Sequence, residues 1–210
     1  MQKGKVVNLR SCNKIFEFAV KNNFLILLTT VFIIGLCIGV FTFGKYETVS
    51  LFSDWYIEDM ISERSNDGFL NIVLNSFIGS AMLLLLVFIC GSSFMGVLLI
   101  PLFVGLKSFL HGSIAAMLYS VYSLKGIAFH AVIILPASII VTVVLLISAK
   151  EAMRFSVLLA RVTLPQSAPI NISLEFKGYC VKFLIISVFV LLSAVVDAII
   201  SCNFLNSFTL

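Results

Sequence analysis

Long apolar runs separated by short polar segments organise this chain. Each run holds about 20 residues or more with few charges, which is the length a helix needs to cross a bilayer. The runs occupy residues 24–44, 69–90, 94–120, 126–149 and 183–202. The pattern therefore predicts an all-α fold, a polytopic integral membrane bundle of five transmembrane helices. Residues 24–203 form a single membrane domain in this prediction.

The composition agrees with a membrane location. Of the 210 residues, 60% are hydrophobic and only 11% are charged, whereas about a quarter of the residues in soluble domains are charged. A water-soluble core is therefore excluded. The net charge of +4 does not indicate a nucleic-acid partner, because no basic patch alternates with aromatic residues.

Lys and Arg are distributed unevenly between the two sides of the predicted bundle. The segment before the first run and the segment 150–182 together hold ten of them, whereas loop 45–68 and the turn at Lys125 hold three. Cytoplasmic segments of membrane proteins are enriched in Lys and Arg. This asymmetry places the N-terminus and loop 150–182 in the cytoplasm, and loop 45–68 outside a bacterial plasma membrane.

The polar segments carry patterns of their own. In residues 1–23, basic side chains recur at helical spacing, so we expect a cytoplasmic amphipathic helix that binds anionic membrane lipids. The alternative is a solvated helix that leads into the first span. The outer loop 45–68 contains Trp55 and Tyr56, which favour a short helix at the membrane surface. The cytoplasmic loop 150–182 should begin as a helix and be broken at Pro165 and Pro169.

Lys107 and His111 are the most informative residues, because they lie four positions apart near the middle of a predicted span. That spacing places them on one helix face, and a cation at that depth costs about 3 kcal/mol or more unless it is met by a partner or water. Polar residues of other spans fall in the same outer half of the membrane. The candidate intramembrane polar cluster is Asn75, Lys107, His111, His130 and Asp197.

Two interpretations of this cluster remain open. It forms either a cavity open to the outside, for a proton, a small substrate or a partner's helix, or a hydrogen-bonded core that fixes helix packing. In the second case Asp197 should meet a histidine or Lys107.

Glycine and proline residues predict local features of the spans. Pro101, Gly105 and Pro136 should kink their helices. Gly35 and Gly39 form a G-x-x-x-G pattern, which permits close helix approach. That approach serves either packing within the chain or a homo-oligomer.

No pattern in the chain indicates catalysis. Phosphate-binding loops, zinc-protease motifs and nucleophile elbows are missing, and the five cysteines form no C-x-x-C pair. The predicted spans leave no soluble domain to hold an active site. We therefore expect no enzyme, no catalytic residue, no cofactor and no metal site.

From about Cys12 to Ile200, the chain resembles the stage II sporulation protein M family. The clearest stretch is Val104–Ser156, where a turn ends in Lys125-Gly126, Pro136 lies in mid-span, and Arg-Phe-Ser closes the segment. The second span, with Asn75 and Gly79, also fits. One departure is Asp197, at a place where the family pattern has a Glu followed by a Pro.

The resemblance implies a non-enzymatic scaffold of the sporulation engulfment machinery in the plasma membrane. Such a protein would anchor peptidoglycan-degrading partners, stage II sporulation proteins P and D, at the septum. The residues themselves leave an alternative, a small permease or the membrane subunit of an ATP-driven transporter. In that case loop 150–182 would be a coupling segment.

Overall fold

The computed structural model describes residues 23–66, 68–162 and 172–204. The amphipathic helix expected over residues 1–23 lies outside these ranges except for Asn23, and so does the break expected at Pro165 and Pro169. The elements are α2 (Asn23–Phe43), α3 (Glu47–Asn66), α4 (Phe69–Gly91), α5 (Gly96–Val121), α6 (Ser123–Phe129), the π-helix η1 (His130–Ile134), α7 (Leu135–Val162) and α8 (Ile172–Phe204). All elements in the described ranges are helices, so the predicted all-α class is confirmed.

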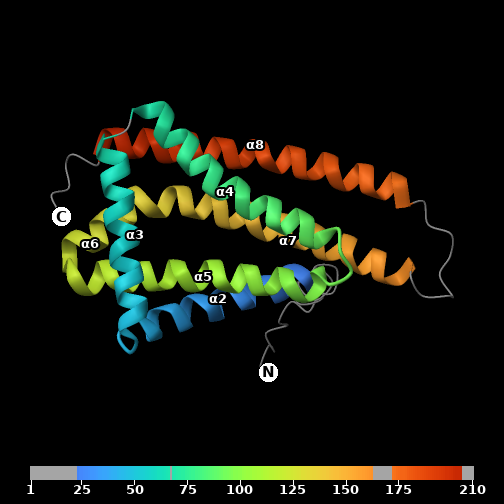
Figure 1. The fold of residues 1–210 in the computed structure, drawn as a ribbon, viewed down its shortest axis with the longest axis horizontal. Coiled ribbons are helices and arrows are strands. Elements are labelled where there is room, and N and C mark those ends of the chain that lie inside the picture. Colours follow the sequence, from blue (N-terminus) through green and yellow to red (C-terminus); the bar gives the residue numbers. More distant parts are fainter. Residues whose placement is uncertain (1–22, 67, 163–171, 205–210) are drawn as a thin grey trace, which may run out of the picture.

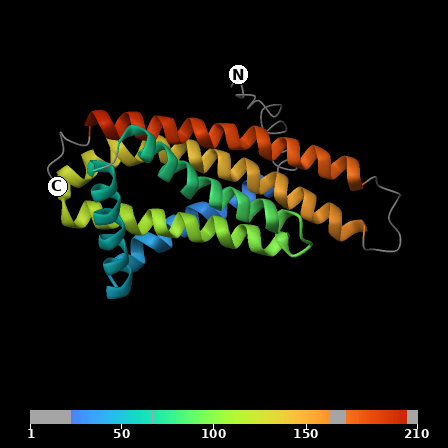
Figure 2. The same ribbon diagram turned by 45° about the horizontal axis from the view of Figure 1, so that its top comes forward.

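Within the described ranges, five helices are long and apolar enough to cross a membrane. They are α2, α4, α5, α8 and the continuous helix of α6, η1 and α7. They form an elongated bundle, and α3 crosses one end of it at a steep angle (Figures 1 and 2). Many large hydrophobic side chains, such as Leu70, Leu98 and Leu184, are exposed on the outside of the bundle, as expected of surfaces that face lipid.

Glycine residues set the contact between α2 and α5. A Cβ on Gly35 would overlap the Ser108 hydroxyl, and one on Gly39 would overlap the Phe109 carbonyl. Only glycine allows the two backbones to lie this close. The G-x-x-x-G face is therefore buried within the chain, and it is not available for the homo-oligomer that we considered as an alternative.

Two hydrophobic clusters hold the bundle together. The larger cluster joins all five spans and includes Leu28, Val87 and Ile100. The smaller cluster lies at the end crossed by α3 and includes Ile57 and Phe129. Along α5 and along the helix of α6, η1 and α7, polar positions fall between these two clusters, so the functional candidates on these helices lie between two apolar cores.

The helices of the α7–α8 hairpin extend beyond the predicted spans. The apolar runs end at residue 149 and begin at residue 183, whereas α7 continues to Val162 and α8 begins at Ile172. The continuation of α7 agrees with the expectation that loop 150–182 begins as a helix, and the early start of α8 was not expected. The Tyr179 ring stacks on Phe155, with ring centroids 4.6 Å apart. An ion pair of 2.6 Å joins Lys182 to Glu151. These contacts between the two helices stabilise helical turns that hydropathy alone does not predict.

The two prolines have different local settings. The residues just before Pro136 form the π-helix η1. There the Leu135 N–H donates to the His130 carbonyl in the i→i+5 pattern of a π-helix. Pro101 lies inside α5, which continues on both sides of it. The irregularity in the fourth span therefore begins at His130, a predicted polar-cluster residue, rather than at the proline.

Candidate polar cavity

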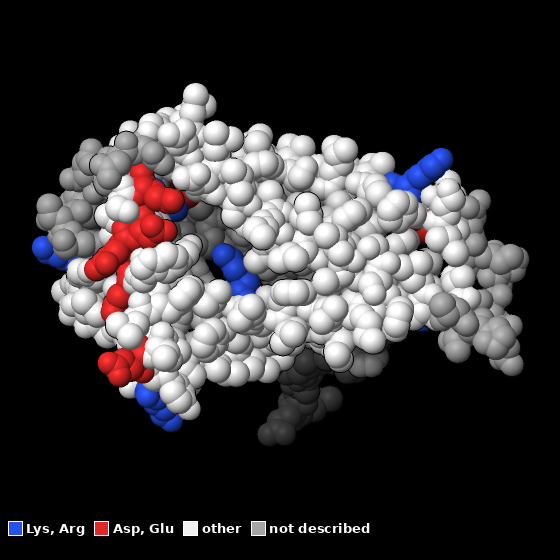
Figure 3. Space-filling model, in the orientation of Figure 1, with Lys and Arg blue, Asp and Glu red and all other residues white. Residues whose placement is uncertain are grey.

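A cavity of about 360 Å³ lies between α3, α4, α5 and α7, and Asp197 of α8 also lines it. We call it the polar cavity. The space-filling view shows a basic side chain inside a hollow, beside a row of acidic side chains over α3 (Figure 3). The hollow opens on the side of the bundle rather than at its tip. The polar cavity is therefore open on the side of the bundle, and its polar groups lie within the length of the spans.

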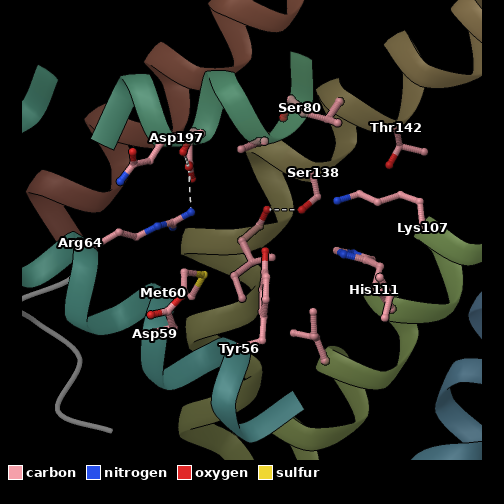
Figure 4. A pocket seen from close by; sticks show the side chains of 18 of the residues that line it. Tyr56, Asp59, Met60, Arg64, Ser80, Lys107, His111, Ser138, Thr142 and Asp197 are labelled. Carbon is pink, nitrogen blue, oxygen red and sulfur yellow. Dashed lines mark hydrogen bonds and ion pairs between the residues drawn. The ribbon is translucent and has the colours of Figure 1, made fainter. Parts of the chain in front are cut away.

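The structure brings together most of the predicted cluster. Asn75, Lys107, His111 and Asp197 all line the polar cavity. Lys107 and His111 project from the same face of α5 (Figure 4), as their spacing predicted. His130 is not a lining residue but lies behind His111, with ring centroids 5.6 Å apart.

Arg64 of α3 is the functional candidate that the sequence reasoning missed. Its Nη2 lies 2.8 Å from Oδ2 of Asp197, and its Nη1 donates to the Ser201 hydroxyl at 3.1 Å. The Ser76 hydroxyl donates to the same Asp197 oxygen at 2.5 Å. The prediction that Asp197 meets a histidine or Lys107 is therefore wrong, because α3 crosses the bundle and brings an arginine from the predicted loop to this carboxylate.

The opposite end of the polar cavity contains polar groups without protein partners. In the described ranges, no hydrogen bond or ion pair is made by the side chains of Ser80, Lys107, His111 and Thr142 at this end, or by that of Asn75, which precedes Ser76 on α4. These side chains come from α4, α5 and α7, and Lys107 carries the positive charge among them (Figure 4). A lysine ammonium offers three donors and no acceptor, so this end is suited to an acceptor-rich or negatively charged group.

His130 continues the polar path behind His111. It is 5% exposed, and its Nδ1 lies 2.8 Å from the Tyr119 hydroxyl in a hydrogen bond whose direction depends on the tautomer. Its Nε2 is buried without a partner among the described residues. His111, His130 and Tyr119 thus form a row of three polar rings that leads away from the cavity.

The α3 side of the cavity is more polar and more open. Tyr56, Asp59 and Glu63 line it, and all three are exposed to some extent. Partial burial raises the pKa of the Tyr56 phenol above its usual value of 10.0, while the positive charge of Arg64 acts in the opposite direction. The phenol therefore stays neutral and keeps its O–H donor at the cavity wall.

The cavity offers no evident metal site. Across the parts of the chain that the structure describes, no three or more His, Cys, Asp or Glu residues gather as metal ligands would. Cys37, Cys90, Cys180 and Cys202 are free thiols. Among the described residues, the polar cavity thus holds one ion pair, one lysine without an ion-pair partner, the two carboxylates of Asp59 and Glu63 on α3, and neutral polar groups.

Comparison with known proteins identifies the family. A family model described as stage II sporulation protein M matches residues 13–202. That range contains four of the five candidate spans, all but the last two residues of the fifth, and every residue that lines the polar cavity. Neither the curated proteins nor the solved structures gave a match. This chain belongs to the stage II sporulation protein M family.

Proposed function

We propose that this protein is a non-enzymatic membrane scaffold of the engulfment machinery. In this role it anchors peptidoglycan-degrading partners, stage II sporulation proteins P and D, at the sporulation septum. Membership of the family supports the link to sporulation. The five apolar spans support a multi-pass position in the plasma membrane.

The observation that carries the scaffold role is the free surface of α3. This helix buries Ser53 and Ile57 against the bundle, while Leu51 is 61% and Trp55 58% exposed on other faces. Acidic side chains are spread over the same helix (Figure 3). A surface of exposed aromatic and acidic residues at the end of a membrane bundle is suited to holding a partner protein.

Recovery of partners from sporulating cells tests this role. We expect the tagged wild-type protein, extracted in detergent, to retain a wall hydrolase, and a Leu51→Ala/Trp55→Ala variant to lose most of it. Leu124→Ala is the matched control, because Leu124 is also highly exposed, at 82%, but lies on α6. Equal recovery with all three proteins would contradict docking on α3. If the wild-type protein retains no wall hydrolase, the scaffold proposal is wrong.

A second candidate is a small permease, and the polar cavity favours it. Lys107 lies inside a span, and the π-helix before Pro136 interrupts regular packing beside it. Both features are frequent where membrane proteins bind or pass polar solutes. The α7–α8 hairpin would then serve as the contact for an ATPase.

Purified protein in liposomes separates the two functions. Flux of a solute or of protons that Lys107→Ala abolishes would favour the permease. Normal recruitment of partners in cells, with no flux in liposomes, would favour the scaffold. Lys45→Ala is the control, since Lys45 is exposed outside the cavity.

A further inference from the structure

We propose that the Lys107 end of the polar cavity binds a phosphate group, carried either by a small soluble molecule or by a lipid headgroup. Lys107 is the counter-ion, and the neutral donors around it complete the site. The proposal concerns a ligand of this chain, and it does not depend on recruitment of partner proteins.

The first argument is the state of Lys107. Its side chain points into the polar cavity from the middle of a span (Figure 4), and it forms no ion pair with any described residue. A lone cation inside a membrane is costly, and such residues almost always face a partner or water-filled space. An anion in the cavity would supply the charge that the described part of the protein does not.

The second argument is the distribution of charge within the cavity. Arg64 neutralises Asp197 at 2.8 Å, and Asp59 lies on α3 on the far side from Lys107 (Figure 4). Glu63 follows Asp59 by four residues on the same helix. The Lys107 end is therefore positive, whereas the α3 end is neutral to negative. An anion is favoured at the Lys107 end only.

The third argument is the set of unused donors. Ser80 and Thr142 carry hydroxyls, and neither is hydrogen-bonded to the described residues. With the ammonium of Lys107, they present several donors from three helices to one space. A phosphate group has three strong acceptor oxygens, whereas a carboxylate has two. The donors and the volume of about 360 Å³ fit a phosphate with its attached group better than a single acidic side chain.

Binding to purified, full-length protein tests the proposal. The protein is purified in a maltoside detergent, which carries no phosphate group, and titrated with inorganic phosphate, and its thermal unfolding midpoint and heat of binding are measured. A second arm adds phosphatidylglycerol to the micelles. We expect saturable binding in at least one arm. Phosphate alone would identify a soluble ligand, and phosphatidylglycerol alone a lipid headgroup.

The variants show whether binding occurs at this site. Lys107→Gln should weaken binding by about tenfold or more, because a charged hydrogen-bond donor is lost. Without ligand it should raise the unfolding midpoint, because the unpaired charge is removed. Lys45→Gln, at an exposed lysine outside the cavity, should change neither. Should Lys107→Gln fail to fold, Thr142→Val must weaken binding by a factor of about 3 to 10.

Three results would overturn the proposal. The first is a lack of saturable binding in both arms, which would indicate a water-filled cavity. The second is equal binding by the wild-type protein and Lys107→Gln. The third is photo-crosslinking from the cavity only to the membrane helix of a co-purified protein. The last result would assign Lys107 to an acidic side chain of that partner instead.

Discussion

Arg64 and Asp197 lie 2.8 Å apart although 133 positions separate them in the sequence. The pair joins α3, which crosses the end of the bundle, to α8, and the Ser76 hydroxyl adds α4 to the same contact. Both side chains are largely buried, at 15% and 7% exposure. This ion pair therefore fixes α3 against the spans and closes one end of the polar cavity.

Removal of one partner should be costly. We expect Arg64→Leu to lower the free energy of unfolding by about 3 kcal/mol, because it leaves the Asp197 carboxylate buried without its counter-charge. The double variant Arg64→Leu/Asp197→Leu should recover more than half of this loss. Trp55 on α3 is the single tryptophan of the chain, so its fluorescence during denaturant unfolding in micelles reports this helix directly.

Arg154→Leu is the matched control for this prediction. Its pair with Glu151 is at 3.3 Å and its side chain is 59% exposed, so the change should cost less than about 1 kcal/mol. Equal losses for Arg64→Leu and Arg154→Leu would show that the Arg64–Asp197 pair contributes little to stability.

The sequence predicted which residues of the spans are unusual but not how they pair. A spacing of four on one helix was enough to place Lys107 and His111 on the same face. The partner expected for Asp197 was a residue of another span. Arg64 was not considered, because it belongs to a segment with too many charges to enter the membrane. Only the path of α3 across the bundle brings Arg64 to Asp197, and hydropathy contains no information about that crossing.

Close approach of α2 and α5 gives a second prediction. Gly39→Ala should destabilise the protein by about 1–3 kcal/mol, since the new methyl group would overlap the Phe109 backbone, which cannot move independently. Gly178→Ala is the control, because nothing lies within 4 Å of a Cβ there. Thermal unfolding in detergent compares the two variants. If Gly39→Ala instead changed the oligomer size at constant stability, the glycine face would serve association between chains.

Tyr179 anchors the part of α8 that extends beyond the predicted span. Its hydroxyl donates to the Phe88 carbonyl at 2.9 Å, and its ring stacks on Phe88 and Phe155. Tyr179→Phe should cost about 0.6–1 kcal/mol, whereas Tyr179→Ala should cost about 3 kcal/mol or more by removing a buried ring. Hydrogen exchange of the α8 amides before Phe183 should rise in the alanine variant. Unchanged exchange there would show that the hairpin does not depend on this ring.

The extended hairpin also shows why the span boundaries differed from prediction. A hydropathy pattern ends where charged residues begin, but a helix continues as long as its backbone and side chains gain contacts. Glu151 and Lys182 are polar and still bond across α7 and α8. The ends of these helices thus depend on contacts between distant segments. The number of spans depends only on the length of each apolar run.

The sidedness of the bundle remains a prediction, and it has a direct test. The start of α2 lies at the same end as the α7–α8 hairpin, since Leu28 and Tyr179 belong to one hydrophobic cluster (Figure 1). The basic residues are concentrated in segments next to that end, which favours its position in the cytoplasm.

In a cysteine-free background, a membrane-impermeant maleimide added to intact cells should therefore label Lys45→Cys and not Arg154→Cys, both of which replace exposed side chains. After the cells are opened, both variants should react, which controls for accessibility. Labelling of Arg154→Cys alone in intact cells would invert the bundle and would place the aromatic and acidic surface of α3 in the cytoplasm, away from any wall hydrolase.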